Sequence, residues 1–381
     1  RTEPVLAYAE VLEAEVGLVA DRLPARMAVT NIHWGGGTPN AMPLAALARL
    51  TERIAARFDI RSDAEIAFEV DPRTFTAEMA PGIAALGANR ASLGVQEFDE
   101  RVQTTVNRIQ PLEVVAATVE RLRAAGIRRI NFDLMYGLPF QTVDTLAETV
   151  ARTVEIGPDR IALFGYAHVP WMAKNQRMIP EEALPGPAER FAQAETAAEL
   201  LVAAGFERIG LDHFARPDDT LAIAAREGRM ARNFQGYVDD PAGALIGFGA
   251  TSISSLPDGY AQNITETGAH GRAVMAGRLP VARGKALTPD DRVRRALIER
   301  LMCDLSVDTA AIARAHGLSA DAFSAEIAGC APYAADGLCE IAGSMVRITE
   351  LGRPAMRVIA AQFDAYLRAP DAPQKRHAVA V

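Results

Sequence analysis

The sequence IHWGGGTP, residues 32–39, ends an apolar stretch that begins at Met27 and is typical of a buried strand. Three glycines at the end of a strand let a ligand approach the backbone, because no Cβ stands in the way. Their N–H groups can then face an anionic or polar ligand. A flexible turn is the alternative for such a run, and the surrounding sequence favours a binding loop.

Short apolar segments alternate with amphipathic segments along the first two-thirds of the chain. The apolar segments, which we predict to be strands, are residues 29–34, 65–70, 90–95, 130–134 and 161–165. Helices are predicted between them at residues 44–58, 112–125 and 142–156. Strands that are apolar on both faces are typical of a parallel sheet covered by helices. Such βα units form either a barrel or a doubly wound sheet, so the fold class is α/β.

Polar residues follow these predicted strands or lie near their ends. They are Gly35–Thr38, Glu69 and Asp71, Gln96 and Glu97, Asp133, and Tyr166 and His168. Barrel enzymes place their chemistry at the carboxyl edge of the strands. Helix capping explains Asp71 and, in part, Glu97. Glu69 and Asp133 lie inside apolar strands, where a carboxylate must be paired or hydrogen-bonded, and we interpret both as site residues.

The bulk composition narrows the class of protein. A chain of 381 residues that is 49% hydrophobic fits a large domain plus a smaller one. The net charge of −8 argues against a nucleic-acid partner. No apolar run is long enough for a membrane span, and no signal peptide is visible. We therefore expect a cytoplasmic protein, and a monomer.

The end of the chain is predicted to form a second, smaller unit. We place the boundary near Gly284, which gives units of residues 1–284 and 285–381. Predicted elements are helices that begin at Thr288, Thr309 and Asp321, a hairpin of residues 338–341 and 345–348, and a last helix at 353–367. This order resembles a winged helix. Because residues 321–329 carry acidic groups and no Lys or Arg, we expect a packing or lid module rather than a DNA-binding one.

The motifs, taken in order, resemble those of the oxygen-independent coproporphyrinogen III oxidase family of radical S-adenosylmethionine (radical SAM) enzymes. The matching stretches are residues 33–39, 68–73, 94–98, 106–108, 133–139, 166–170, 212–219, 233–237 and 247–254. Related haem chaperones share the GGGTP run. The stretches around Asp212, Gln235 and Ile253 favour the porphyrinogen enzymes.

The resemblance implies a fold, cofactors and a reaction. The implied fold is a partial (β/α)6 barrel, here without its first strand, plus a C-terminal winged-helix-like α+β module. The implied cofactors are a [4Fe–4S] cluster and two S-adenosylmethionine molecules, which supply a 5′-deoxyadenosyl radical. The implied reaction is the oxidative decarboxylation of two propionates of coproporphyrinogen III to vinyl groups, giving protoporphyrinogen IX in haem biosynthesis. An electron donor, which the sequence does not identify, is a further expected partner.

The resemblance also implies site residues, although it assigns no catalytic residue. Those expected at the first S-adenosylmethionine are Gly36, Glu69 and Ile253. Those expected at the second are Gly37, Thr38, Gln96, Arg108, Asp133 and Ala167, with Gln235 as a weaker candidate. A guanidinium can hold a carboxylate with two hydrogen bonds, as we expect of Arg108. Arg177 and Arg216 are candidates for binding the carboxylates of the tetrapyrrole.

The cysteines depart from the family pattern. The family holds its cluster with a C-x-x-x-C-x-x-C motif, which this sequence lacks and which we expect upstream of Arg1. Cys303, Cys330 and Cys339 do not match the motif, and we expect them to be buried apolar filler rather than metal ligands. We therefore expect this chain alone to be inactive. A haem chaperone and a non-radical barrel lyase that uses Glu69 and Asp133 remain the alternatives.

Overall fold

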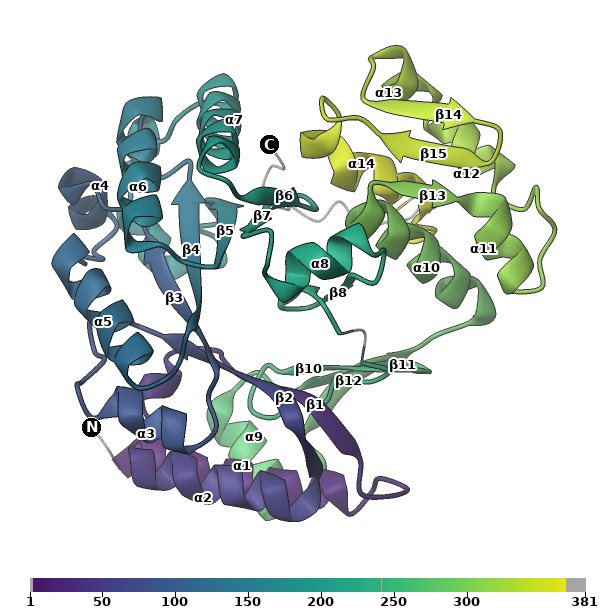
Figure 1. Ribbon diagram of the computed structural model, residues 1–381. Coiled ribbons are helices and arrows are strands. Elements are labelled where there is room, and N and C mark those ends of the chain that lie inside the picture. The colour runs from purple at the N-terminus through teal and green to yellow at the C-terminus, as the bar shows by residue number, and fades with distance from the viewer. Residues whose placement is uncertain (1–2, 241, 368–381) are drawn as a thin grey trace.

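The largest element of the fold is a seven-stranded sheet with the order β1-β2-β3-β4-β5-β7-β6 (Figure 1). The computed structural model describes residues 3–240 and 242–367. The parallel strands are β1 (Ala28–Trp34), β2 (Asp59–Val70), β3 (Arg90–Gln96), β4 (Arg129–Tyr136) and β5 (Arg160–Gly165). They confirm the five predicted strands, although β2 begins six residues before the predicted Glu65 and β1, which was predicted to be buried, is exposed or only partly buried at every residue. The antiparallel strands β6 (Glu207–Ile209) and β7 (His213–Ala215) extend the sheet.

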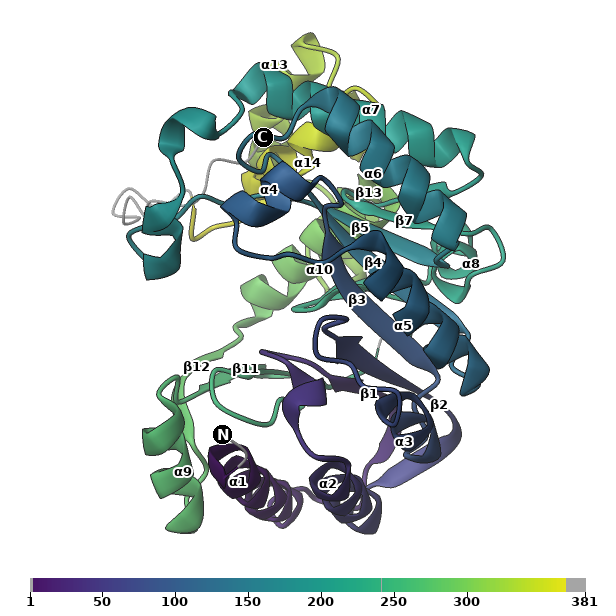
Figure 2. The same ribbon diagram turned by 90° about the vertical axis from the view of Figure 1, so that its left-hand side faces the viewer.

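Helices cover one face of this sheet, and smaller elements lie on the other (Figures 1 and 2). The helices are α1 (Glu3–Ala20), α2 (Leu44–Arg57), α3 (Met79–Ala85), α4 (Glu100–Thr105), α5 (Leu112–Ala124), α6 (Val143–Ile156) and α7 (Pro187–Ala203). The sequence specifies α6 at both ends, because Thr142 forms a capping box and Gly157 ends the helix in the left-handed conformation. Within residues 3–240 and 242–367, no helix combines the length and apolar character needed to cross a membrane.

Strand β4 shows how the sheet separates its core from its site. Phe132 and Leu134 are fully buried in the main hydrophobic core, together with apolar residues of the helices. Side chains alternate along a strand, so Asp133 projects from the opposite face. The strand pairing places Gly94 of β3 and Ala162 of β5 on either side of Asp133, and His213 of β7 beside Ala162. A row of four strands thus presents Asp133 and His213 on the same face.

The segment between β7 and the C-terminal unit contains short elements that the sequence analysis did not predict. They are α8 (Thr220–Arg226), the hairpin of β8 (Ala231–Asn233) and β9 (Gly236–Val238), β10 (Ile253–Leu256), β11 (Gly259–Asn263), α9 (Thr267–Met275) and β12 (Val281–Ala286). Strands β10, β11 and β12 form a separate antiparallel sheet. Gly284, where the sequence places the domain boundary, lies inside β12.

The C-terminal elements pack around a core of their own. They are α10 (Pro289–Asp304), β13 (Ser306–Asp308), α11 (Thr309–Ala315), α12 (Ser324–Gly329), α13 (Ala331–Ala335), β14 (Cys339–Ala342), β15 (Met345–Ile348) and α14 (Met356–Ala360). The predicted hairpin is confirmed as β14–β15, and β13 adds a third strand. The cysteines are buried, as predicted for apolar filler.

The predicted last helix, residues 353–367, is wrong. The segment consists of the 3₁₀ turn η4 (Arg353–Ala355), the short helix α14 and the 3₁₀ turn η5 (Ala361–Phe363). The guanidinium of Arg353 is buried and donates to the carbonyl of Gly210, while Phe363 is fully buried in the C-terminal core. These tertiary contacts override the helical periodicity of the sequence.

Candidate functional site

His33, near the end of β1, and Gly36, in the loop that follows, hold the carboxylate of Glu69 at the end of β2. His33 Nε2 lies 2.9 Å from Glu69 Oε1, and the Gly36 N–H donates to Glu69 Oε2 over 3.1 Å. Burial alone would raise the pKa of Glu69, but the hydrogen bond and charge of His33 and the Gly36 N–H lower it overall. Glu69 is therefore ionised at neutral pH. The sequence analysis named Glu69 and Gly36 but missed the role of His33.

The three glycines of this loop are needed for different structural reasons. A Cβ on Gly35 would lie 2.6 Å from both Glu69 Oε1 and His33 Nε2, so any side chain there would displace the ends of both. Gly36 and Gly37 have φ angles of 76° and 66°, a region that favours glycine. A Cβ on either residue would meet no atom within 4 Å. The loop therefore presents its backbone to open space, as a loop that contacts a ligand must.

Arg108 and Gln96 converge on Gly94 of β3. The Arg108 NH2 group donates to the Gly94 carbonyl over 2.7 Å, and Gln96 has a φ of 68°, which is uncommon outside glycine. A Cβ on Gly94 would lie 3.1 Å from both Arg108 NH2 and Gln96 Nε2. Two buried atoms, Arg108 Nε and Gln96 Oε1, have no hydrogen-bond partner within the described part of the chain. A donor and an acceptor left open in this way suit a ligand that carries both a carboxylate and an ammonium group.

Asp133 lies on this same face of the sheet, and its pKa is strongly raised. Burial raises the pKa of Asp133 to about 6, and the charges of His213, Glu69, His33 and Arg108 act on it with smaller effect. No hydrogen bond to its carboxyl oxygens is present among residues 3–240 and 242–367. Asp133 is thus an acceptor available to a hydroxyl or ammonium group of a ligand.

His213 is a member of this group that the sequence analysis quoted without a role. Its Nδ1 lies 2.8 Å from Oδ1 of the adjacent Asp212. Burial alone would raise the pKa of Asp212, but the hydrogen bond and charge of His213 lower it overall. The signal in the sequence is the pair Asp212-His213 itself, but only the pairing of β7 with β5 shows that it lies near Asp133.

Three further predicted site residues are Ala167, which lies two residues after the end of β5, Gln235 and Ile253. The carbonyl of Ala167 accepts from Gln176 Nε2 over 3.0 Å, Gln235 is exposed at the tip of the β8–β9 hairpin, and Ile253 begins β10. Within the described residues, no hydrogen bond or ion pair joins any of them to Glu69 or Asp133.

A buried carboxylate fixes the loop that leads to Ile253. Glu15 of α1 accepts from the Gly249 N–H over 2.9 Å and from Asn263 Nδ2 over 2.6 Å. His270 Nε2 lies 3.1 Å from the same carboxylate. Burial raises the pKa of Glu15, and these partners oppose that effect. The network holds the start of β10 in place beside α1.

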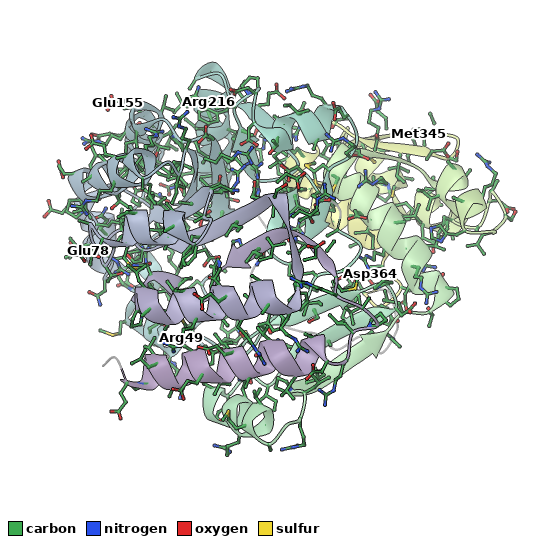
Figure 3. The ribbon with its side chains drawn as sticks, turned by 60° about the horizontal axis from the view of Figure 1, so that its bottom comes forward. Arg49, Glu78, Glu155, Arg216, Met345 and Asp364 are labelled. Atoms are coloured by element: carbon green, nitrogen blue, oxygen red, sulfur yellow. The ribbon has the colours of Figure 1, made fainter. Side chains whose placement is uncertain are left out.

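Arg216 does not belong to the site, which corrects the suggestion that it binds a substrate carboxylate. It follows β7, which runs antiparallel to β5, and therefore lies at the amino end of β5. Its guanidinium stacks on Phe206 at 4.2 Å from the ring centroid and donates to the carbonyl of Ala204. Figure 3 shows Arg216 at the margin of the molecule.

The described residues do not provide a site for an iron–sulfur cluster. Cys303, Cys330 and Cys339 are buried in or beside the C-terminal core, and burial raises the pKa of Cys303 to about 12. A thiol of that kind is a poor source of the thiolate that binds iron. Among residues 3–240 and 242–367, no cluster of three or more His, Cys, Asp or Glu side chains could hold a metal ion.

Comparison with known proteins identifies the class. The model of the radical SAM superfamily matches residues 5–153, and the model of the HemN C-terminal domain matches residues 287–355. The fold and the site therefore define a radical SAM enzyme.

Close relatives then identify the family. The oxygen-independent coproporphyrinogen III oxidase of Bradyrhizobium diazoefficiens is 46% identical over 367 residues, which cover 96% of this chain and 82% of the relative. The enzyme of the same name from Paracoccus denitrificans is 44% identical, with 96% and 80% covered. The solved structure of coproporphyrinogen III oxidase (HemN) from Escherichia coli, a radical SAM enzyme, superposes with a TM-score of 0.92 at 38% identity, over 96% of this chain and 84% of that chain. The chain belongs to the oxygen-independent coproporphyrinogen III oxidase family.

The cofactors of this family can be compared with the residues present. The family uses a [4Fe–4S] cluster and S-adenosylmethionine. The open glycine loop, the unpartnered Arg108 Nε and Gln96 Oε1, and the carboxyl of Asp133 fit S-adenosylmethionine, which carries an amino-acid group and ribose hydroxyls. The three cysteines do not fit the cluster.

Proposed function

We propose that this chain provides the S-adenosylmethionine and substrate sites of an enzyme that decarboxylates two propionates of coproporphyrinogen III to vinyl groups, giving protoporphyrinogen IX. The observation that carries the proposal is the open donor–acceptor pair, Arg108 Nε and Gln96 Oε1, beside an unpartnered Asp133. This arrangement occurs in a chain that is 46% identical to an oxygen-independent coproporphyrinogen III oxidase.

The proposed roles follow from the chemistry of each side chain. Arg108 holds the carboxylate of S-adenosylmethionine, while Gln96 and Asp133 accept from its ammonium or hydroxyl groups. These three residues hold the second S-adenosylmethionine, while Glu69, which is ionised and accepts from the Gly36 N–H, also accepts from the first. The complete proposed sets are Gly36, Glu69 and Ile253 for one molecule, and Gly37, Thr38, Gln96, Arg108, Asp133 and Ala167, with Gln235 as a weaker member, for the other. Bound S-adenosylmethionine supplies the hydrogen-abstracting chemistry of the radical SAM superfamily.

We also infer the finer architecture. The parallel order of β1 to β5, with helices on one face, supports a partial (β/α)6 barrel within residues 1–284. Helices α10 to α12 and the β14–β15 hairpin support a winged-helix-like unit within residues 285–381. A cytoplasmic location, a monomeric state and a separate electron donor stay predictions from the sequence.

A fusion protein tests the function. A segment that carries a C-x-x-x-C-x-x-C motif is placed before Arg1, reconstituted with iron and sulfide, and mixed with a reductant, S-adenosylmethionine and coproporphyrinogen III. We expect protoporphyrinogen IX from the fusion and none from the same fusion with the three motif cysteines changed to serine. A fusion that cleaves S-adenosylmethionine and leaves coproporphyrinogen III unchanged would overturn the proposal.

The same experiment separates the two alternatives. A haem chaperone would bind haem tightly and form no vinyl product. A non-radical lyase that uses Glu69 and Asp133 would act without the added cysteines. The names of relatives at 40–46% identity favour the porphyrinogen enzyme over both.

A further inference from the structure

The segment between β5 and α7 lies at the carboxyl edge of the sheet, where the site is. Tyr166 and Ile179 pack with Met135 of β4 and with Leu138, so the start and the middle of this segment rest against β4, which carries Asp133, and the loop after it. Gln176 ties the segment to itself, because its Nε2 donates to the Ala167 carbonyl and its Oε1 accepts from the Val169 N–H over 2.6 Å. Figure 2 shows the segment, in teal, projecting from the side of the sheet.

Residues 171–178, here called the rim segment, expose an unusual amount of apolar surface. Trp171 is 48% exposed, Met172 75% and Met178 88%. Scattered exposed apolar residues are ordinary, but three large ones within eight residues at the edge of a site form a patch. A surface of this kind suits a broad apolar ligand, because tryptophan and methionine supply adaptable contact area.

The two basic residues of the rim segment lack acidic partners. Lys174 makes no hydrogen bond or ion pair with any described residue, and Arg177 donates only to the carbonyl of Pro170 over 3.1 Å. Some arginines elsewhere are paired with acids, as Arg208 is with Glu195 at 3.0 Å, and others, such as Arg123, donate to backbone carbonyls. In the 3₁₀ helix η2 (Lys174–Met178), residues three apart lie on the same side, so both cations face one direction. These two cations can therefore attract an anion, although the chain as a whole carries a net charge of −8.

We propose that the rim segment receives the tetrapyrrole substrate. Trp171, Met172 and Met178 contact its apolar macrocycle, and Lys174 and Arg177 pair with its propionate carboxylates. An apolar ring that carries carboxylates at its periphery is complementary to this combination of exposed apolar groups and unpaired cations. The inference rests on the proposed function and names the part of the molecule that holds the substrate.

Binding of coproporphyrin III, the oxidised and fluorescent form of the substrate, tests the proposal without need of the cluster. Affinity is measured from the porphyrin's own fluorescence, on the unaltered chain and on Lys174→Gln/Arg177→Gln. We expect the double variant to bind about tenfold more weakly, since two exposed charge pairs of about 0.7 kcal/mol each are lost. The matched control is Arg314→Gln/Arg347→Gln, which removes two exposed charges from the C-terminal unit and should leave affinity unchanged. Trp171→Ala should also weaken binding.

The uncharged tetramethyl ester of coproporphyrin III separates the two kinds of contact. The ester should bind equally to the unaltered chain and to the Lys174/Arg177 variant, and more weakly to Trp171→Ala. Equal affinity of the unaltered chain and the double variant for the free acid would overturn the assignment of the rim segment and leave the proposed function standing. Failure of the unaltered chain to bind coproporphyrin III at all would count against both.

Discussion

His33 Nε2 and Glu69 Oε1 lie 2.9 Å apart, and each would be only 2.6 Å from a Cβ on Gly35. The ion pair therefore occupies the volume that any side chain at residue 35 would need. The carboxylate uses its other oxygen to accept from Gly36, whose backbone faces open space. His33, Gly35 and the distant Glu69 thus form one unit that shapes the binding loop.

Gly35→Ala is expected to break this unit while leaving the fold intact. The added methyl group pushes aside the ends of His33 and Glu69, which are side-chain atoms, so the backbone need not move. S-adenosylmethionine affinity, measured by calorimetry, should fall at least about tenfold, because one charge-assisted hydrogen bond is worth roughly 1.5–3 kcal/mol. Gly243→Ala is the control, because a Cβ there meets no atom within 4 Å. Unchanged affinity in Gly35→Ala would contradict this account of the loop.

Gly94→Ala should separate Arg108 from Gln96. A methyl group at Gly94 would lie 3.1 Å from the terminal nitrogens of both side chains, which must each move by a few tenths of an ångström. We expect S-adenosylmethionine to bind roughly tenfold more weakly, because aligned hydrogen bonds lose strength when their donors shift. Gly243→Ala, where an added Cβ meets no atom within 4 Å, is again the control. If both variants bind equally well, Arg108 and Gln96 are not ligands at this position.

The sequence predicts the parallel strands of the large sheet better than the small sheet of β10, β11 and β12. Strands β1 to β5 were predictable because short segments rich in apolar residues alternate with amphipathic segments, and Glu69 and Asp133 were conspicuous as carboxylates inside such segments. Strand β12 was not predicted, because all its residues are exposed and their pattern is not that of a buried strand. It forms by antiparallel pairing with β11.

Contacts between distant segments account for most of what could not be predicted. The role of His213 depends on the pairing of β7 with β5, and that of His33 depends on Glu69, 36 residues away. Local periodicity carries no information on either contact. The broken helix after Arg353 has the same cause, since a buried hydrogen bond to Gly210 draws Arg353 into the interior.

Asp133 should make the protein less stable at neutral pH than in mild acid. Its pKa is raised from 3.8 to about 6, so the folded chain holds this proton more tightly than the unfolded chain does. The free energy of unfolding therefore falls as the pH rises from about 4 to about 6, and the loss of stability persists above that range. Asp133→Asn removes the titrating carboxyl group, which should stabilise the protein by up to about 3 kcal/mol at pH 7.5.

Thermal unfolding between pH 4 and pH 8 measures this effect. The midpoint of Asp133→Asn should exceed that of the unaltered chain at pH 7.5, and the two should converge at pH 4. The control Asp336→Asn changes an exposed aspartate of the C-terminal unit and should follow the unaltered chain. Parallel curves for Asp133→Asn and the unaltered chain would exclude a raised pKa. The variant should also lose affinity for S-adenosylmethionine, because Asn offers a neutral acceptor where the carboxylate offers a charged one.

Asp219 is expected to matter for stability and not for binding, because it lies at the opposite end of the strands. Its side chain accepts from Arg160 Nε over 2.6 Å and from the Leu221 N–H over 2.8 Å, and its second oxygen lies 3.6 Å from Arg90 NH2. Arg90 and Arg160 begin β3 and β5, so this buried network closes the amino edge of the sheet. Asp219→Asn removes one of the two carboxylates that face each guanidinium, since Glu65 still pairs with Arg90 and Asp239 with Arg160, and it should cost about 1.5–3 kcal/mol. Urea unfolding measures the loss of stability, with the exposed neighbour Asp218→Asn as the matched control.

The affinity of the Asp219→Asn variant for S-adenosylmethionine should stay within about twofold of the unaltered chain under conditions where the variant is folded. A variant that kept its stability and lost its affinity would place the binding site at the amino edge of the sheet instead.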